Sequence, residues 1–472
     1  TAKNYCTPVN VAELQSAIEK LKATVQSEID WLYETRCDRC GGSATTGYTV
    51  YSQVFQCPRC MEQVALFDCV EVEGTTAAGK PKTISACPNC QKRGFVEEIN
   101  TRSRKFGAMP VLVRYECQNG CKPAKDERRH NDQNSKKREY FEKCDLGKLR
   151  EIEVKTIPHW YPQNKMMNVE DDSQPWGDKW RAGTSNFRTV AELYTKRNLW
   201  ALAACRAALA GLALPDSISA ASALWTVITT LSLTGTKMLR EEKRAIQSGT
   251  YYLPPVFREI KIFNGLEYNA FQLTKAEEAL LGSFSQLPEL IISTQSALLL
   301  EAIPANSLDY VFTDPPYAEM VQYGELNFVW EAWLSFDTHW HDDEIIVNEV
   351  RGRTEEDWSN MLRSAMAECY RVLKPGRWLS LCFHGSESTW ALVQDIMVDV
   401  GFFVDSSAKT LFIDAGQKSY NQTMADKVNQ RDLVINFRKP RPDEGQASIK
   451  IMGNEDAATF SEKVREMIGA FL

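Results

Sequence analysis

The chain has 472 residues, of which 43% are hydrophobic and 25% are charged, so it can bury more than one core and we expect two or three domains. Its net charge of -7 excludes a generally basic surface, and any contact with nucleic acid must therefore use local positive patches. The sequence has no run of about eighteen apolar residues and no basic stretch followed by an apolar core at its start, which indicates a soluble, cytoplasmic protein.

The first predicted element is an amphipathic helix near the start of the chain. Between Val9 and Tyr33, apolar residues recur every three or four positions, which places them on one face of a helix. We therefore expect residues 1–34 to be the leading helix of the catalytic domain.

A cysteine-rich segment follows at residues 35–121. Eight of the 14 cysteines fall there in four close pairs, between β-prone runs at 48–55 and 110–115. A large chain without a signal peptide favours metal binding over disulfides. Taken in chain order, the pairs predict two structural four-cysteine zinc sites. The first would use Cys37, Cys40, Cys57 and Cys60, and the second Cys87, Cys90, Cys117 and Cys121.

Residues 122–187 are predicted to connect this double zinc-ribbon insertion to the rest of the chain. The part at 122–150 is polar and basic and is interpreted as a mobile or solvated connector, and a Pro- and Trp-rich irregular loop follows it. The zinc ribbons and the connector can contact DNA phosphates. Alternatively, the metals only fold an insertion too small to have its own core. Two helical patterns at about 188–211 and 217–248 predict a helical subdomain over 188–250.

From about Glu289 the pattern alternates between strands and helices. Short apolar runs at 290–292, 308–313, 378–383 and 433–437, with a helix at 355–372, predict a parallel α/β sheet. We assign the catalytic domain to residues 251–440 and a C-terminal tail to 441–472.

The segment Asp314-Pro315-Pro316-Tyr317 directly follows one of these predicted strands. Two prolines cannot continue a ladder, so they impose a rigid turn at the strand's carboxyl end, where open α/β sheets bind ligands. Asp314 and the carbonyl of Pro315 can accept both hydrogens of an amine, and Tyr317 can stack on a flipped-out base. The alternative is a surface turn, because Asp and Pro are common turn formers.

This segment resembles motif IV of the amino-group DNA methyltransferases, and Asp at its first position is similar to the adenine-N6 enzymes rather than the cytosine-N4 enzymes. The resemblance implies a Rossmann-like class I S-adenosylmethionine methyltransferase sheet, interrupted by the zinc insertion and the helical subdomain, acting on double-stranded DNA. It implies that Asp314, Pro315, Pro316 and Tyr317 are catalytic and that Ser296, Thr313 and Asp314 contact the cofactor. Ser296 stands where the family has an acidic residue.

A closer resemblance is to large adenine-specific DNA methylases that carry cysteine-rich insertions and are often encoded near phage-defence genes. The segments at 195–199, 323–330 and 417–434 carry this resemblance, and 384–386 resembles a pocket-lining segment. A glycine-rich cofactor loop, which the family has ahead of a stretch like 2–9, does not follow any predicted strand. We therefore expect a separate polypeptide or a further segment to supply that loop, and the chain to be part of a longer polypeptide.

The sequence thus predicts an S-adenosylmethionine-dependent adenine-N6 DNA methyltransferase, in restriction-modification or phage defence, with two structural Zn²⁺ ions. One alternative is a non-catalytic DNA-binding or assembly subunit. Another is an amino methyltransferase that acts on cytosine N4, RNA or protein.

Overall fold

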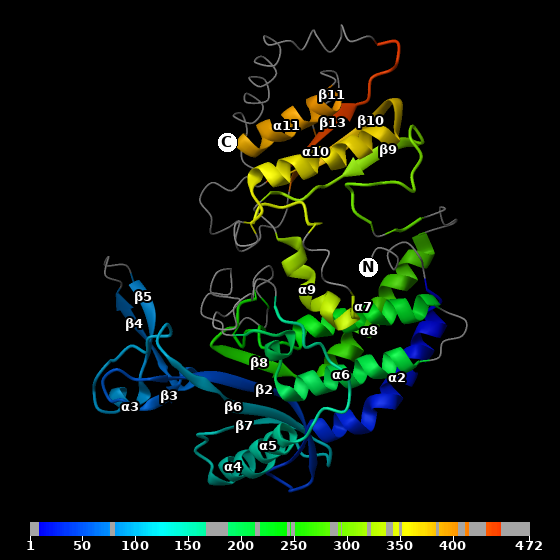
Figure 1. The fold of residues 1–472 in the computed structure, drawn as a ribbon. Coiled ribbons are helices and arrows are strands. Elements are labelled where there is room, and N and C mark those ends of the chain that lie inside the picture. The colour runs from blue at the N-terminus through cyan, green and yellow to red at the C-terminus, as the bar shows by residue number, and fades with distance from the viewer. Residues whose placement is uncertain are drawn as a thin grey trace. The chain divides into compact units, whose positions relative to one another are not determined.

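The computed structural model describes residues 9–75, 81–166, 187–212, 218–242, 246, 251–283, 291–293, 295–318, 322–336, 343–348, 352–383, 387–404, 411–414 and 431–444. The chain divides into two compact units, which are described separately (Figure 1). The first unit comprises Thr1–Ile292 with Leu326–Thr338, and the second comprises Ser293–Glu325 with His339–Leu472.

The first unit contains both helices and antiparallel strands. Its helices are α2 (Val11–Leu32), α3 (Pro88–Gln91), α4 (Ser135–Tyr140), a π-helical turn at Phe141–Leu146, α5 (Gly147–Val154), α6 (Lys196–Gly211), α7 (Ile218–Thr234), α8 (Ile262–Ser283) and most of α9 (Tyr323–Leu334), with short 3-10 turns at Leu66–Asp68 and Val190–Leu193. Its strands are β1 (Glu34–Arg36), β2 (Ser43–Gln56), β3 (Gln63–Ala65), β4 (Val70–Thr75), β5 (Pro81–Ala86), β6 (Lys105–Cys117), β7 (Lys125–Arg129) and β8 (Val256–Ile260).

Strand β2 organises the main sheet of this unit. It pairs antiparallel with β6 along one side, and with β1, β8 and β3 in turn along the other. β7 extends the sheet beyond β6, while β4 and β5 form a separate two-stranded ribbon. Because β8 joins this sheet, residues 251–283, which the sequence assigned to the catalytic domain, belong to the first unit.

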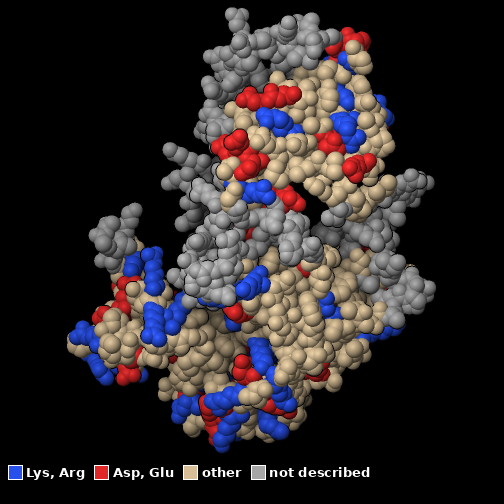
Figure 2. Space-filling view, in the orientation of Figure 1, with Lys and Arg blue, Asp and Glu red and all other residues tan. Residues whose placement is uncertain are grey.

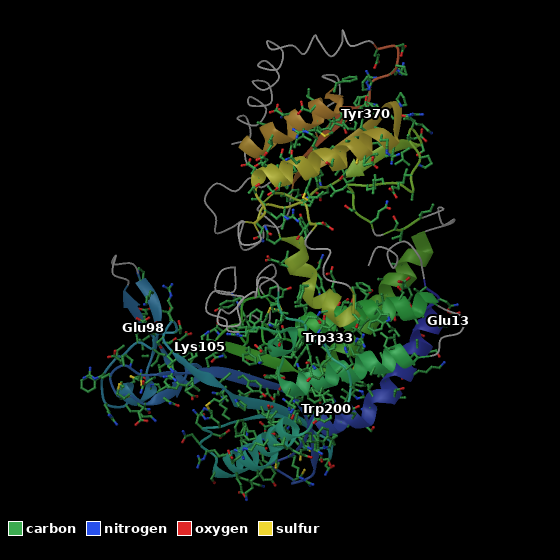
Figure 3. All side chains as sticks on the ribbon, viewed as in Figure 1. Glu13, Glu98, Lys105, Trp200, Trp333 and Tyr370 are labelled. Atoms are coloured by element: carbon green, nitrogen blue, oxygen red, sulfur yellow. The ribbon has the colours of Figure 1, made fainter. Side chains whose placement is uncertain are left out.

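Helices α2, α6, α7 and α8, with parts of α5 and α9, share one hydrophobic core. The predicted helix at Val9–Tyr33 is confirmed by α2, which buries the apolar face that contains Leu14, Leu21 and Ile29. The two predicted helical patterns that follow are confirmed in part, because α6 begins only at Lys196, α7 ends at Thr234, and residues 235–242 are not helical. α6 is buried nearly all round, and its Trp200 indole N–H donates to Glu28 Oε1 on α2 at 2.5 Å (Figure 3).

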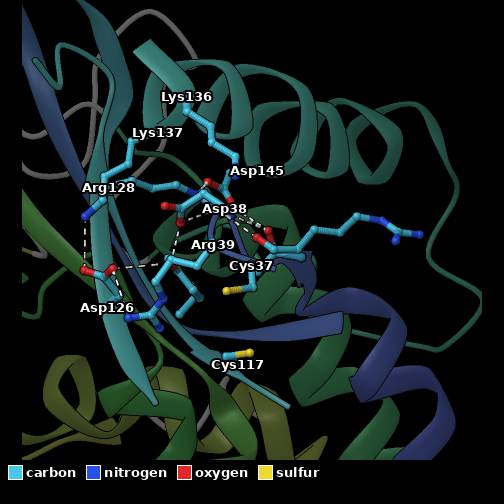
Figure 4. A network of polar contacts seen from close by, with 12 residues as sticks. Cys37, Asp38, Arg39, Cys117, Asp126, Arg128, Lys136, Lys137 and Asp145 are labelled. Carbon is cyan, nitrogen blue, oxygen red and sulfur yellow. Dashed lines mark hydrogen bonds and ion pairs between the residues drawn. The ribbon is translucent and has the colours of Figure 1, made fainter. Parts of the chain in front are cut away.

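The segment after the cysteine region is folded and partly buried, so the prediction of a mobile or solvated connector is wrong. Arg128 on β7 is completely buried. Its guanidinium donates to both carboxylate oxygens of Asp145 at 2.5 and 2.7 Å, to Thr35 Oγ1 at 2.7 Å and to the Arg36 carbonyl at 2.8 Å (Figure 4). The charge that suggested solvation is satisfied inside the protein by a carboxylate that is also buried.

The second unit contains a smaller, mixed sheet. Its elements are β9 (Leu308–Thr313), α10 (Glu355–Val372), β10 (Leu373–Phe383), α11 (Glu387–Val400), β11 (Phe403–Val404), β12 (Leu411–Asp414) and β13 (Arg431–Arg438). β9 and β10 are parallel, whereas β13 runs antiparallel to β10 and pairs on its other side with β11 and β12.

This sheet confirms some predicted elements and corrects others. The strand at 308–313 and the helix at 355–372 are confirmed, and a capping box between Thr354 and Asp357 starts the helix. The expectation of a parallel sheet is confirmed for β9 and β10 but not for β13, which is antiparallel to β10, because an apolar run does not encode strand direction. No strand forms at 291–292, where Ile291 is 95% exposed. The Rossmann-like arrangement as a whole stays a prediction.

Among the described helices, none combines the length and apolarity needed to cross a membrane.

Candidate functional site

The Asp-Pro-Pro-Tyr segment leaves the end of β9, the parallel strand beside β10. The last residue of β9, Thr313, is in register with Leu381 on β10, and the ladder stops where the prolines begin. Pro315 is buried, whereas Asp314 is exposed. The segment therefore buries Pro315 in the second unit and exposes the Asp314 carboxylate to solvent.

Tyr317 links this carboxylate to the end of the neighbouring strand. Its hydroxyl donates to Asp314 Oδ1 at 2.6 Å, and its ring meets that of Phe383, the last residue of β10, edge-on with centroids 5.5 Å apart and an interplanar angle of 89°. Trp358 on α10 lies beside Phe383, with ring centroids 6.5 Å apart, and both side chains are fully buried. Ala318, at the end of the turn, has a φ of 50°. The structure thus brings Asp314 and Tyr317 together on an aromatic support.

A buried polar cluster lies just after the turn. Asn348 donates through Nδ2 to Gln322 Oε1 at 2.8 Å and to Glu325 Oε1 at 3.2 Å, and the Gly324 N–H donates to Glu344 Oε1 at 2.8 Å. The segment at 323–330, which contains Glu325, carries part of the resemblance described above, but the sequence gave no signal for Asn348 or Glu344, because these contacts form only after folding. The segments at 384–386 and 417–422 lie outside the described residues.

Ser296 is not joined to the Asp-Pro-Pro-Tyr segment by any contact of the described residues. It is exposed, and its Oγ accepts a hydrogen bond from the Leu298 N–H at 3.2 Å. The chain that follows it is bonded to the last turn of α10, next to the start of β9, where Leu300 N–H donates to Glu368 Oε2 at 2.8 Å. Hydrogen bonds from Arg371 and from that N–H lower the pKa of Glu368 to about 2. This anchor lies at the opposite end of β9 from Asp314.

The eight paired cysteines form two clusters with a nested pairing, so the chain-order pairing is wrong. One cluster consists of Cys37, Cys40, Cys117 and Cys121, and the other of Cys57, Cys60, Cys87 and Cys90. In each cluster the sulfur atoms all lie within 4.8 Å of one another.

The length of β2 explains the nested arrangement. Cys40 precedes this strand of 14 residues and Cys57 follows it, so at about 3.3 Å per residue the two cysteine pairs are separated by about 45 Å. β6 then runs antiparallel back along β2, and the register that pairs Cys117 with Ala44 returns the fourth cysteine pair to the first.

The sulfur spacings fit a tetrahedral metal site. Zinc–sulfur bonds of about 2.3 Å directed to the corners of a tetrahedron give sulfur–sulfur distances of about 3.8 Å. The measured distances are 3.9 Å for Cys37–Cys121, 3.8 Å for Cys40–Cys117, 3.7 Å for Cys57–Cys90 and 3.8 Å for Cys60–Cys87. These are far too long for disulfides, whose sulfur atoms are about 2.05 Å apart. Both clusters can therefore hold a metal ion.

The first cluster, which contains Cys37, is built into the surrounding fold. Burial acts to raise the pKa of the Cys37 thiol, but N–H groups of Cys40 and Arg39 donate to its sulfur and lower the pKa to about 6. Between its first two cysteines, Asp38 is buried and accepts a hydrogen bond from the Tyr115 hydroxyl (Figure 4). Arg39 donates to the Pro123 carbonyl at 2.5 Å.

An open cavity of about 760 Å³ lies within the first unit, apart from every site residue suggested by the sequence. Its wall includes Tyr51 and Phe257, whose rings are stacked 5.1 Å apart at 2°. Arg197 also lines it and forms a buried ion pair with Glu259.

No protein-family model and no curated protein matches the chain. Structures of a candidate DNA modification methylase from Thermus thermophilus match 31% of the chain; a selenomethionine form matches at 18% identity over 50% of its length, with a TM-score of 0.19. A complex of that protein with S-adenosyl-L-methionine matches at 19% identity over 53% of its length, with a TM-score of 0.18. The match spans about half the length of those structures, and similarity of this degree supports no inference about this chain.

Proposed function

We propose that the chain is an S-adenosylmethionine-dependent amino methyltransferase that methylates adenine N6 in double-stranded DNA. The observation that carries the proposal is the position of Asp314 directly after β9, hydrogen-bonded to Tyr317, which packs on the end of β10. The carboxyl ends of parallel strands are where open α/β sheets bind ligands.

The chemistry follows from the hydrogen-bonding capacity of this turn. An ionised carboxylate offers about four lone-pair sites, so Asp314 can accept from the Tyr317 hydroxyl and still accept from an exocyclic amine. The Pro315 carbonyl would take the second amine hydrogen, which leaves the nitrogen lone pair directed at an electrophile. The Tyr317 ring, positioned by Phe383, would stack on the flipped-out base. Most of the rate enhancement would then come from orientation.

S-adenosylmethionine would supply the electrophilic methyl group. Ser296 and Thr313, together with Asp314, are the proposed contacts of this chain to the donor. The described residues fit the target amine better than the donor, because the Ser296 hydroxyl already accepts from Leu298 and its segment is anchored at the far end of β9. We therefore assign no step of the reaction to them, and propose that a glycine-rich loop on a separate polypeptide or a further segment completes the donor site.

The two cysteine clusters are proposed to hold one structural Zn²⁺ each. All eight proposed ligands are cysteine sulfur atoms at tetrahedral spacing, which leaves no position for a reactive water. The zinc ions would fold the extended sheet of the first unit rather than take part in methyl transfer.

Transfer of a labelled methyl group to duplex DNA tests the activity. We would compare wild type with Asp314→Ala, each alone and with a polypeptide that carries a glycine-rich cofactor loop. Asp309→Ala is a matched control, because Asp309 is an exposed carboxylate on β9, the strand that precedes Asp314, and pairs with Lys374 and Arg377 instead. The proposal predicts that Asp314→Ala loses transfer and Asp309→Ala keeps it. Equal labelling by wild type and Asp314→Ala would refute the catalytic role of Asp314.

The same assay separates the alternatives. A non-catalytic DNA-binding or assembly subunit would bind DNA without transferring methyl groups under either condition. An enzyme for cytosine N4, RNA or protein would label those substrates in preference to adenine in duplex DNA. A role in restriction-modification or phage defence belongs to the same proposal and would appear as protection of methylated DNA from a partner nuclease.

A further inference from the structure

The second cysteine cluster lies in an arm of the first unit that also contains α3, β4 and β5 (Figure 1). Figure 2 shows Lys and Arg side chains at the outer edge of this arm, with Asp and Glu side chains among them. Some charged side chains of this arm form ion pairs, as Lys82 does with Glu98, whereas others are available to a partner.

Two tight turns expose the residues that surround the cluster. The Met61 N–H donates to the Cys57 carbonyl at 3.0 Å, and the Phe95 N–H donates to the Cys90 carbonyl at 3.0 Å. Gly94, with a φ of 81°, lets the second turn reverse without strain. We call the exposed residues of these two turns the knuckle-tip surface; they are Arg59, Met61, Lys92, Arg93, Phe95 and Val96.

The knuckle-tip surface combines exposed apolar side chains with cations. Met61, Phe95 and Val96 are 60%, 45% and 60% exposed. The Arg59 guanidinium lies 3.6 Å from the centre of the Phe95 ring, so the two turns contact each other through an arginine stacked on an aromatic ring.

Among the described residues, Arg59, Lys92 and Arg93 form no ion pair with a carboxylate. Arg39, in the corresponding turn of the first cluster, does have partners. Arg39 donates to a carbonyl and lies 3.6 Å from Asp126 Oδ2. Two clusters of the same type therefore differ: the first is bonded into the fold, and the second presents unpaired positive charge.

Two further exposed arginines follow the second turn along the chain. Arg104 lies 5.2 Å from the centre of the Phe106 ring, which is 38% exposed, and Arg102 is also exposed. The same segments contain three carboxylates, Glu62, Glu97 and Glu98, of which Glu98 pairs with Lys82. They are outnumbered by the five basic residues Arg59, Lys92, Arg93, Arg102 and Arg104.

We propose that the knuckle-tip surface binds the phosphate backbone of double-stranded DNA. This inference rests on the proposed function, from which the DNA substrate is taken. A protein with a net charge of -7 can hold DNA only through local positive patches, and this patch has cations that are not neutralised by neighbours. Arginine stacked on an exposed ring is pre-organised, so little side-chain freedom is lost when a phosphate binds.

The salt dependence of DNA binding tests the proposal. The triple variant Arg59→Ser/Lys92→Ser/Arg93→Ser removes three phosphate contacts, each contributing about 0.9 to the slope of log K against log salt concentration, so the slope should decrease in magnitude by about 2.7. Binding of a labelled duplex would be followed by fluorescence anisotropy. Circular dichroism and zinc content would establish that the variant is folded.

A matched control removes the same charge elsewhere in the unit. Lys125→Ser/Arg129→Ser/Lys143→Ser also removes three exposed cations, but these are paired with Glu116, Glu127 and Glu139. The slope of this control should remain within about 0.9 of wild type, less than one phosphate contact.

The outcomes separate this inference from the proposed function. If wild type methylates DNA and the triple variant binds with an unchanged slope, the inference is wrong and the proposed function stands. If the slope of the triple variant decreases by about 2.7 as predicted but wild type transfers no methyl group, the inference stands and the proposed function fails. Tenfold tighter binding of an RNA duplex than of the matching DNA duplex would overturn the assignment of DNA as partner.

Discussion

The nested pairing of the cysteines makes a prediction that separates it from pairing in chain order. In the nested arrangement, Cys40 and Cys117 are ligands of one cluster, with sulfur atoms 3.8 Å apart, while Cys60 belongs to the other. Cys40→Ser/Cys117→Ser should therefore destroy one site and leave the second intact. Cys40→Ser/Cys60→Ser should damage both.

The expected magnitudes follow from ligand number. Structural zinc is bound by apparent free energies of about 10–16 kcal/mol through four ligands. Loss of two thiolates removes most of this free energy, and loss of one thiolate weakens a site enough for a competing chelator to remove the zinc. Wild type should carry about two zinc ions, one per cluster. Cys40→Ser/Cys117→Ser should keep about one, and Cys40→Ser/Cys60→Ser should keep almost none.

The assay is elemental analysis of zinc per chain after gel filtration against a weak chelator. The reverse pattern, no zinc in Cys40→Ser/Cys117→Ser and about one in Cys40→Ser/Cys60→Ser, is what chain-order pairing requires and would refute the nested arrangement. Cys205→Ser is a suitable control, because this buried cysteine lies on α6 outside both clusters, and its zinc content should match wild type.

Two further predictions concern stability. Arg128→Leu leaves Asp145 buried without its cation and should lower the free energy of unfolding, measured with denaturant, by about 3–5 kcal/mol. Arg128→Leu/Asp145→Leu should recover most of that loss. A free energy of unfolding for Arg128→Leu within about 1 kcal/mol of wild type, about the limit of the method, would contradict the buried network. Arg371 and the Leu300 N–H lower the pKa of Glu368 from 4.5 to about 2, so its contribution is present above about pH 4.5 and is lost as the pH falls toward 2. The difference in Tm between wild type and Glu368→Gln should therefore narrow over that window, and a difference independent of pH would oppose this assignment.

Local patterns in the sequence predicted the elements that depend on local residues. The apolar spacing of α2 was sufficient because the helix buries one apolar face. The apolar run of β9 predicted a strand, but not its environment, because no residue of β9 is fully buried and Tyr310 and Phe312 are 54% and 59% exposed. The start of α10 has its own capping residues, Thr354 and Asp357, three positions apart.

Features that depend on long-range partners were not predictable in this way. The basic character of the segment containing Arg128 suggested solvation, and only the fold places Asp145 and Thr35 around its guanidinium. The spacing of Cys40 and Cys57 is compatible with one zinc site, but an extended strand between them separates the two.

The candidate site also combines a feature that local residues predict with surroundings that depend on long-range partners. The position of Asp314 after a strand could be predicted from the prolines that follow it. Its surroundings could not, because Phe383 and Trp358, which support Tyr317, are contributed by other elements more than 40 residues along the chain. The polar contacts of Asn348 likewise form only through the fold.

The identity of the methylated nucleoside tests the central claim most directly. Duplex DNA would be incubated with S-adenosylmethionine, the chain and the loop-bearing polypeptide, digested to nucleosides and analysed by mass spectrometry. The account predicts N6-methyldeoxyadenosine with wild type and with Asp309→Ala, and none with Asp314→Ala. N4-methyldeoxycytidine as the main product, or N6-methyldeoxyadenosine formed equally well by Asp314→Ala, would contradict it.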